Sequence, residues 1–361
     1  MLIMIKRLYL YTTLFFIVFM AIFLCINSFF SNIVNAQCFI EHYKLGEKFF
    51  NNCECDSAIN YFREANKCSN SDEYRNESVK IAQMIKKCNE RAIKEIQLLS
   101  DNQLLLIQGG AFYLGCTDDQ CTLGLNGCDK TDCPQTSVKV NSFYITQSEV
   151  TVAQFELFIK SSNYITDAEK SGYSSLYLDS LSDWIEASGI NWKCGIDGNP
   201  YLSDLSKIDF PVVFVSWNDA NEYCKWLSAE TGCKYRLPKE KEWEYAAYDG
   251  DKKNIIWFCN SFNDVAWYFT NSSEKFNSSK KRKPSKLDLY DMFGNVWEWC
   301  DDWYFTGYGM NSVEIISGQK VLRGGSYLSS FSDCMFYRNS SSQEYSCGQF
   351  GFRIVRQINE P

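Results

Sequence analysis

The most informative stretch of this chain is "LYDMFGNVWEWCDDWY", residues Leu289–Tyr304. Gly294 and Asn295 at its centre predict a tight turn. Asp291 and Glu298 flank that turn, which places two carboxylates beside backbone carbonyls that the turn leaves unpaired. Carboxylate and carbonyl oxygens are the ligands that a hard cation such as Ca²⁺ prefers. The stretch therefore predicts a cation site, and the alternative is an ordinary turn with Glu298 in a salt bridge.

Around this stretch, the chain from residue 104 onward alternates short apolar runs with Gly, Asn, Asp and Ser. The pattern predicts strand, turn and strand over 104–116, then a strand followed by a helix capped at Thr151, and later a helix that ends near Gly232. A further helix is expected over 239–250, with Trp243, Tyr245 and Ala246 facing the core and two glutamates in its first turn beside the positive end of the helix dipole. No phosphate-binding glycine motif is present, so we expect a loop-rich mixed domain.

The first 36 residues have the features of an export signal. They contain Lys6 and Arg7, no acidic residue, an apolar run over 8–30, and small residues up to Ala36. The run is longer than in most cleaved signals, so an uncleaved N-terminal membrane anchor is the alternative to cleavage after Ala36. In both cases residues 37–361 are expected outside the cytoplasm, as a secreted, periplasmic or membrane-anchored protein.

The charge of the exported part argues against nucleic-acid binding. Without Lys6 and Arg7, 34 of the 36 basic residues remain against 44 acidic ones, a net charge of −10. Such a chain repels a phosphate backbone. The one basic run, over 280–283, is interpreted as a solvated loop.

The cysteines and the histidine restrict the chemistry further. Sixteen of the 17 cysteines lie beyond the signal, and an even number in an exported chain predicts disulfides. Four of them, Cys116, Cys121, Cys128 and Cys133, lie close together, and a zinc site is the alternative there. The single histidine, His42, argues against Ser/His/Asp hydrolases and multi-histidine metal enzymes, and we expect it on the surface of a helix.

Residues 37–100 have the three- and four-residue apolar spacing of helices, over 43–50, 56–68 and 78–99. The spacing of small and apolar residues in the first two resembles one tetratricopeptide repeat, with the positions Leu45, Gly46, Phe49, Ala58, Phe62 and Ala65. A helical stalk and a peptide-binding role are both left open. Four cysteines, Cys53, Cys55, Cys68 and Cys88, suggest that this region is cross-linked. The predicted organisation is thus a signal or anchor over 1–36, a helical domain over 37–100 and a larger domain over 101–361.

Five blocks in the larger domain occur in a specific order: "IQGGAFYLGC", "FYITQSEVTVAQF", "PVVFVSWNDANEYCKWL" with "YRLPKEKEWEYAA", "LYDMFGNVWEWCDDWY", and "RGGSY" with "GFR". Together they resemble the sulfatase-modifying-factor family, the formylglycine-generating enzymes, over residues 104–357. The resemblance implies a single α+β domain with little regular secondary structure and a C-type-lectin-like architecture. It also implies structural calcium at Asp291, Glu298 and the carbonyls of Gly294 and Val296.

The resemblance breaks at the catalytic site. In the family, two cysteines five residues apart bind copper(I), and the enzyme oxidises a sulfatase cysteine to formylglycine. Their positions are occupied here by Ser329 and Cys334, while Ser326 and Trp297 match other active-site positions. The hydroxyl of Ser329 is a hard donor that stays protonated at neutral pH, so copper is not expected.

Two further expectations follow from this departure. The asparagine that precedes "GFR" in the family is replaced by Gln349 and Phe350, and Cys334 is predicted to form a disulfide with Cys347. The chain is therefore expected to be a non-catalytic scaffold or binding module for a protein or peptide partner. The alternative is a formylglycine-generating oxidase that acts on a sulfatase; iron-dependent relatives need histidines that this domain lacks.

Overall fold

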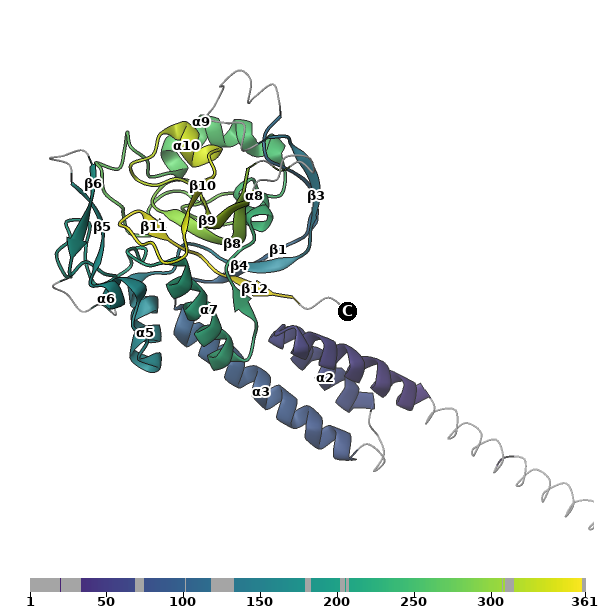
Figure 1. Ribbon diagram of the computed structural model, residues 1–361. Coiled ribbons are helices and arrows are strands. Elements are labelled where there is room, and N and C mark those ends of the chain that lie inside the picture. The colour runs from purple at the N-terminus through teal and green to yellow at the C-terminus, as the bar shows by residue number, and fades with distance from the viewer. Residues whose placement is uncertain are drawn as a thin grey trace, which may run out of the picture. The chain divides into compact units, whose positions relative to one another are not determined.

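The computed structural model describes residues 34–68, 75–100, 102–117, 133–178, 183–201, 208–306 and 315–358, together with residues 20, 205 and 308. They form two compact units, and the division falls between Ile93 and Lys94 (Figure 1). Apart from Met20, the apolar run of the predicted signal lies outside the described residues, as do Cys121 and Cys128. Within the described ranges, no helix has both the length and the apolar character needed to cross a bilayer.

The first unit is helical, as predicted. It contains a helix over 34–51, then α2 (Cys55–Cys68) and most of α3 (Arg75–Leu99). Gly46 lets the first two helices approach closely, because a Cβ atom at this position would lie 2.5 Å from the ring of Phe62. A disulfide joins Cys38 to Cys68 and ties the first helix to the end of α2. The relationship to a tetratricopeptide repeat stays a prediction.

The second unit contains two four-stranded sheets and two strand pairs. The first sheet has the order β1 (Leu104–Ile107), β4 (Phe143–Thr146), β12 (Val355–Gln357) and β7 (Tyr235–Arg236), all antiparallel. The second has the order β10 (Asn339–Ser342), β9 (Ile315–Arg323), β8 (Trp297–Phe305) and β11 (Phe350–Gly351). The pairs are β2 (Gly110–Leu114) with β3 (Thr136–Val140), and β5 (Tyr173–Leu178) with β6 (Asp183–Ser188).

Two groups of helices of this unit lie on opposite sides of the strands in the view of Figure 1. Figure 1 shows α9 (Ile255–Val265) and α10 (Phe331–Met335) on one side, and α5 (Val152–Ser162), α6 (Asp167–Ser171) and α7 (Trp217–Thr231) on the other. The predicted helix boundaries are confirmed. Thr151 caps α5 in a capping box with Gln154, and α7 ends at Gly232, whose φ is 69°. Strands of two to nine residues agree with the predicted loop-rich α+β domain.

Helix α8 (Glu240–Ala247) is held by buried charges as well as by apolar contacts. Trp243, Tyr245 and Ala246 are buried, as predicted. The glutamates expected to interact with the helix dipole are buried too. These two glutamates and Glu244 form ion pairs: Glu240 with Arg338 at 2.6 Å, Glu242 with Arg236 at 2.6 Å, and Glu244 with Arg323 at 2.7 Å. The helix therefore has a structural role, and its acidic residues form ion pairs with arginines outside the helix.

The basic side chains of residues 281–283 interact with acidic and aromatic residues of the same chain. Lys281 and Lys283 form ion pairs with Asp209 and Asp264, at 3.3 and 3.0 Å. The Arg282 guanidinium lies 3.6 Å from the centre of the Trp267 ring. The side chains of Lys281 and Lys283 are 57% and 74% exposed, in agreement with a solvated loop.

The cysteines only partly follow the disulfide prediction. Cys116 and Cys133 are disulfide-bonded, as expected, and so are Cys53 and Cys233. However, the second unit also buries Cys194, Cys224, Cys300, Cys334 and Cys347 as free thiols. These side chains lie in the apolar interior, where a thiol packs as a small hydrophobic group and needs no partner.

Candidate functional site

The turn predicted before β8 is present. Gly294 and Asn295 both have positive φ angles, 78° and 57°. Their backbone N–H groups donate to the carbonyls of Gly324 and Trp267, each at 2.7 Å. The turn therefore lies against the "RGGS" segment that follows β9 and brings two blocks of the sequence together.

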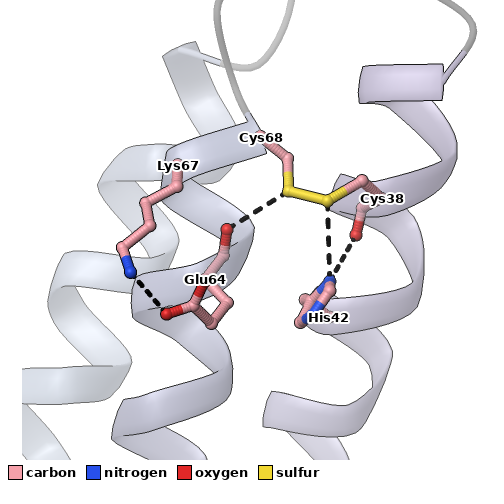
Figure 2. Close-up of a disulfide and its surroundings, with 5 residues drawn as sticks. All are labelled: Cys38, His42, Glu64, Lys67 and Cys68. Carbon is pink, nitrogen blue, oxygen red and sulfur yellow. Dashed lines mark hydrogen bonds and ion pairs between the residues drawn. A yellow bond between two sulfur atoms is a disulfide. The ribbon is translucent and has the colours of Figure 1, made fainter.

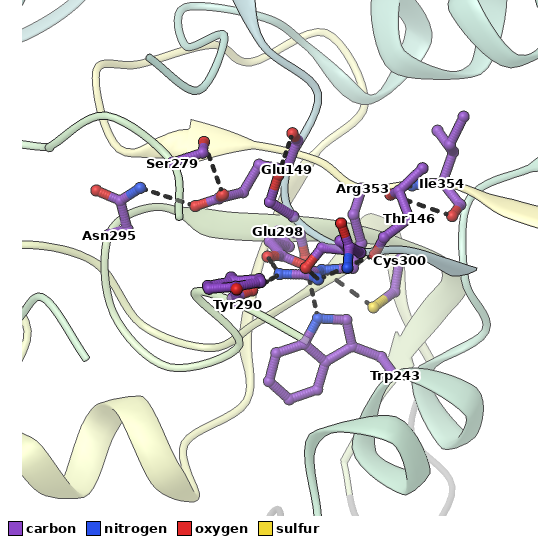
Figure 3. A network of polar contacts seen from close by, with 12 residues as sticks. Thr146, Glu149, Trp243, Ser279, Tyr290, Asn295, Glu298, Cys300, Arg353 and Ile354 are labelled. Atoms are coloured by element: carbon purple, nitrogen blue, oxygen red, sulfur yellow. Dashed lines mark hydrogen bonds and ion pairs between the residues drawn. The ribbon is translucent and has the colours of Figure 1, made fainter. Parts of the chain in front are cut away.

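Glu298 faces the arginine of the C-terminal "GFR" block, as Figure 3 shows. Arg353 Nε and Nη2 donate to the two carboxylate oxygens at 2.6 and 2.7 Å. Trp243 Nε1 adds a third donor at 2.7 Å. Both charged side chains are almost completely buried, Arg353 0% exposed and Glu298 1%. Although burial disfavours the guanidinium charge, Glu298 holds the pKa of Arg353 above its usual value.

Two further buried carboxylates lie near this ion pair. Glu149 accepts from Asn295 Nδ2 at 2.8 Å and from Ser279 Oγ at 3.1 Å (Figure 3). Asp291 Oδ2 accepts from the Lys280 backbone N–H at 2.8 Å. Burial raises the pKa of Asp291 to about 6, and burial together with the charges of Asp291 and Glu298 raises that of Glu149. The cluster thus places three buried carboxyl groups around one guanidinium, which disfavours ionisation of all three at once.

The four positions expected to hold calcium differ in whether their oxygen atoms are free to bind a cation. Asp291 Oδ1 is buried and has no hydrogen-bond partner among the residues that the structure describes. A buried, unpaired carboxylate oxygen costs free energy that a bound cation would recover. Gly294 and Val296 lie on the adjoining turn, while the carboxylate of Glu298 is already engaged by Arg353 and Trp243. Asp291 is therefore the side chain best placed for a cation.

Two of the positions that correspond to the family's catalytic site, Trp297 and Ser326, both contact Gln349, the residue before β11, which pairs in parallel with β8. Trp297 N–H donates to the carbonyl of Gln349 at 2.7 Å, and the Ser326 hydroxyl donates to the Gln349 side-chain oxygen. Ser329 closes a turn with Ser326: its Oγ accepts from Ser326 N–H at 2.9 Å, and its own N–H donates to Ser326 O at 3.0 Å. Gln349, expected only as one of the two residues that replace the family's asparagine, thus bonds to both Trp297 and Ser326.

Cys334 lies on α10, beneath the glycine pair of "RGGS". It is 1% exposed, and a Cβ atom added at Gly325 would lie only 2.6 Å from its Sγ. Burial and the charge of Asp333 raise the pKa of this thiol far above its usual value. The reactive form of a cysteine is the thiolate, so a thiol in this environment is a poor nucleophile and metal ligand.

The predicted disulfide between Cys334 and Cys347 is wrong, because both are free thiols. Cys334 packs in the core cluster that contains Met335 and Phe336. The backbone of Cys347 instead forms an isolated parallel β-bridge with Ser175 of β5. The short separation in sequence that suggested the pair does not bring them together, because the segment between them passes through β10.

Comparison with known proteins identifies the domain. Residues 90–358 match the family described as "Sulfatase-modifying factor enzyme 1-like domain". The chain belongs to this family. The formylglycine-generating enzyme of Mus musculus is 30% identical to this chain over 295 residues, which cover 71% of this chain and 76% of the mouse protein. That of Streptomyces coelicolor is 32% identical over 297 residues, 70% of this chain and 88% of the bacterial protein.

The sulfatase-modifying-factor family also contains relatives described as inactive. The "Inactive C-alpha-formylglycine-generating enzyme 2" of Bos taurus is 30% identical over 255 residues, which cover 62% of this chain and 76% of the bovine protein. Among solved structures, PvdO from Pseudomonas aeruginosa superimposes with a TM-score of 0.53 at 21% identity, over 71% of this chain and 94% of PvdO. The structural likeness supports the formylglycine-generating-enzyme-like fold expected from the sequence.

Proposed function

We propose that this protein is an exported, non-catalytic member of the sulfatase-modifying-factor family that binds a protein or peptide partner. One observation carries the proposal: the first of the two thiol positions is Ser329, whose hydroxyl closes a turn with Ser326. The remaining thiol, Cys334, is buried and protonated. Copper(I) favours paired thiolates, and this site offers neither a pair nor a thiolate. The inactive bovine relative supports the same assignment.

The alternative function is that of a formylglycine-generating oxidase. It is favoured by the similarity to the mouse and Streptomyces coelicolor enzymes, which covers 71% and 70% of this chain. For that chemistry a second soft ligand would have to replace Ser329, and the nearest candidate from the sequence, Cys347, lies in a different part of the fold. The partner under either function is a polypeptide, and a sulfatase is the candidate that the relatives suggest.

We expect the purified protein to leave a "CxPxR" peptide unoxidised in air with copper and a thiol reductant present. Mass spectrometry of the peptide measures the outcome, with the mouse enzyme as the positive control. The matched variant Ser329→Cys restores the missing thiol and is expected to gain copper(I) binding, measured by competition with a chromophoric chelator. Turnover by the unmodified protein would exclude the non-catalytic proposal.

We also propose that the acidic turn before β8 binds structural calcium, through Asp291 and the carbonyls of Gly294 and Val296. The unpaired Asp291 Oδ1 supports this site. At a calcium concentration of about 100 times Kd, binding would stabilise the fold by about 2.7 kcal/mol. We expect calcium to raise the Tm in differential scanning calorimetry, and a chelator to lower it.

The variant Asp291→Asn is expected to remove this calcium response. Asp288→Asn is the matched control, because Asp288 is an exposed acidic residue three positions earlier on the same loop. Glu298 is less suitable for the test, since its replacement also breaks the ion pair with Arg353. An equal calcium response in wild type and Asp291→Asn would rule out the site.

A further inference from the structure

The only histidine of the chain lies beside a disulfide in the first unit, as Figure 2 shows. Cys38 and His42 are four residues apart on one helix, which places both side chains on the same face. Cys38 Sγ lies 3.7 Å from His42 Nδ1, and Cys68 reaches the same point from the end of α2. The ligand atoms of Cys38, His42 and Cys68 all lie within 4.8 Å of one another. His42 is therefore part of a defined cluster, contrary to the expectation of a simple surface residue.

We propose that this cluster is a redox-controlled metal site, which binds Zn²⁺ through Cys38, His42 and Cys68 once the disulfide is reduced. Two thiolates and an imidazole are ligands typical of zinc. With Zn–S and Zn–N bonds of about 2.3 and 2.0 Å, a tetrahedral zinc holds its sulfur and nitrogen ligands roughly 3.5 Å apart. The separation of Cys38 Sγ and His42 Nδ1, 3.7 Å, is close to this value. Two non-bonded sulfurs on the same zinc lie about 3.8 Å apart, a separation that reduced Cys38 and Cys68 reach by side-chain rotation.

The chemistry balances in two steps. Two equivalents of an external thiol reduce the Cys38–Cys68 disulfide to two thiols and are themselves oxidised to one disulfide. Zinc then replaces one proton on each thiol, so two protons are released for each Zn²⁺ bound. Oxidation by a low-molecular-weight disulfide reverses the sequence and expels the metal. Cys38 and Cys68 are partly exposed, which gives the reductant access.

The surroundings of His42 suit both states. In the disulfide form, His42 Nδ1–H donates to the Cys38 carbonyl at 2.9 Å, because a carbonyl can only accept. Zinc binding through Nδ1 requires that this proton moves to Nε2. The Glu64 carbonyl lies 3.3 Å from Cys68 Sγ, whereas the Glu64 carboxylate is paired with Lys67. A water molecule therefore takes the fourth position on the zinc. The first helix thus stays tied to α2 in either state, by a covalent bond or by a metal.

The experiment uses the full-length protein, reduced with a phosphine without oxygen and titrated with Co²⁺ as the probe for zinc. We expect thiolate-to-cobalt charge-transfer absorption, displaced by Zn²⁺ and absent from the oxidised protein at this site. Because other cysteines also bind cobalt, the decisive measurement is the difference between variants. His42→Ala, Cys38→Ser and Cys68→Ser should each bind one fewer Co²⁺ per chain than wild type.

Cys88→Ser is the matched control, since Cys88 is a buried cysteine of the same unit outside the cluster. It should keep the full cobalt stoichiometry. After reduction, His42→Ala offers the same two thiols as wild type, so its loss of metal reports on the imidazole alone. Circular dichroism checks that its helices are retained. If His42→Ala and wild type bind the same number of cobalt ions, or if the phosphine leaves Cys38–Cys68 intact in the native protein, the proposal is wrong.

Discussion

Replacing Gly294 by alanine is expected to prevent stable folding of the second unit. The φ of Gly294 is 78°, and an alanine Cβ would lie 1.9 Å from the backbone carbonyl oxygen of Trp267. Neither the carbonyl nor the turn can move freely, because Asn295 N–H donates to that same oxygen at 2.7 Å. The variant combines a disfavoured backbone conformation with a clash against main chain, and we expect a loss of about 4 kcal/mol or more in the free energy of unfolding.

Gly318→Ala separates the two causes. Gly318 has a φ of 84°, but a Cβ atom there meets nothing within 4 Å. Only the backbone preference is lost, at a cost of about 1 kcal/mol. Urea unfolding followed by tryptophan fluorescence compares the two variants with wild type. Equal losses for Gly294→Ala and Gly318→Ala would show that the contact with Trp267 has no energetic role.

Replacing Arg353 by methionine is expected to destabilise the protein by about 3–5 kcal/mol, because it leaves the carboxylate of Glu298 buried without a counter-ion. Arg353 supplies two of the three donors to Glu298, and both residues are at most 1% exposed. The double variant Arg353→Met/Glu298→Gln removes both charges and keeps an oxygen for Trp243 Nε1. We expect it to be more stable than the single variant.

Urea denaturation of the wild type, both single variants and the double variant forms a double-mutant cycle for this pair. A favourable coupling free energy between Arg353 and Glu298 is the expected result. If the double variant is as unstable as Arg353→Met, the loss comes from the arginine's packing and its bonds to the backbone of Tyr290 and Gln147.

Features with a local signal could be predicted from the sequence. The turn at Gly294, the cap at Thr151, the helix end at Gly232 and the buried face around Trp243 each depend on residues within a few positions of one another. The order of the blocks predicted the family, and the replacement at Ser329 predicted the missing thiol. All of these are properties of short segments.

The partners of buried charges could not be predicted in this way. Glu298 and Arg353 are 55 residues apart, and Glu240 and Arg338 are 98 apart. From the sequence, a glutamate in the first turn of α8 is equally compatible with an interaction with the helix dipole and with an ion pair to a distant arginine. The ion pair becomes predictable only when the packing of the sheets is known. The same limit explains the wrong disulfide: proximity of Cys334 and Cys347 in the chain says nothing about the strand that separates them.

The late strands have a consequence for synthesis of the chain. β11 completes the second sheet beside β8, and β12 lies between β4 and β7 in the first. A ribosome-bound chain without residues 350–357 lacks the strand that joins β4 to β7 and the guanidinium that neutralises Glu298. The helical unit can form as soon as its own residues emerge, since its contacts are local. The larger unit must wait, and until those eight residues are translated its aromatic interior stays accessible to chaperones and proteases.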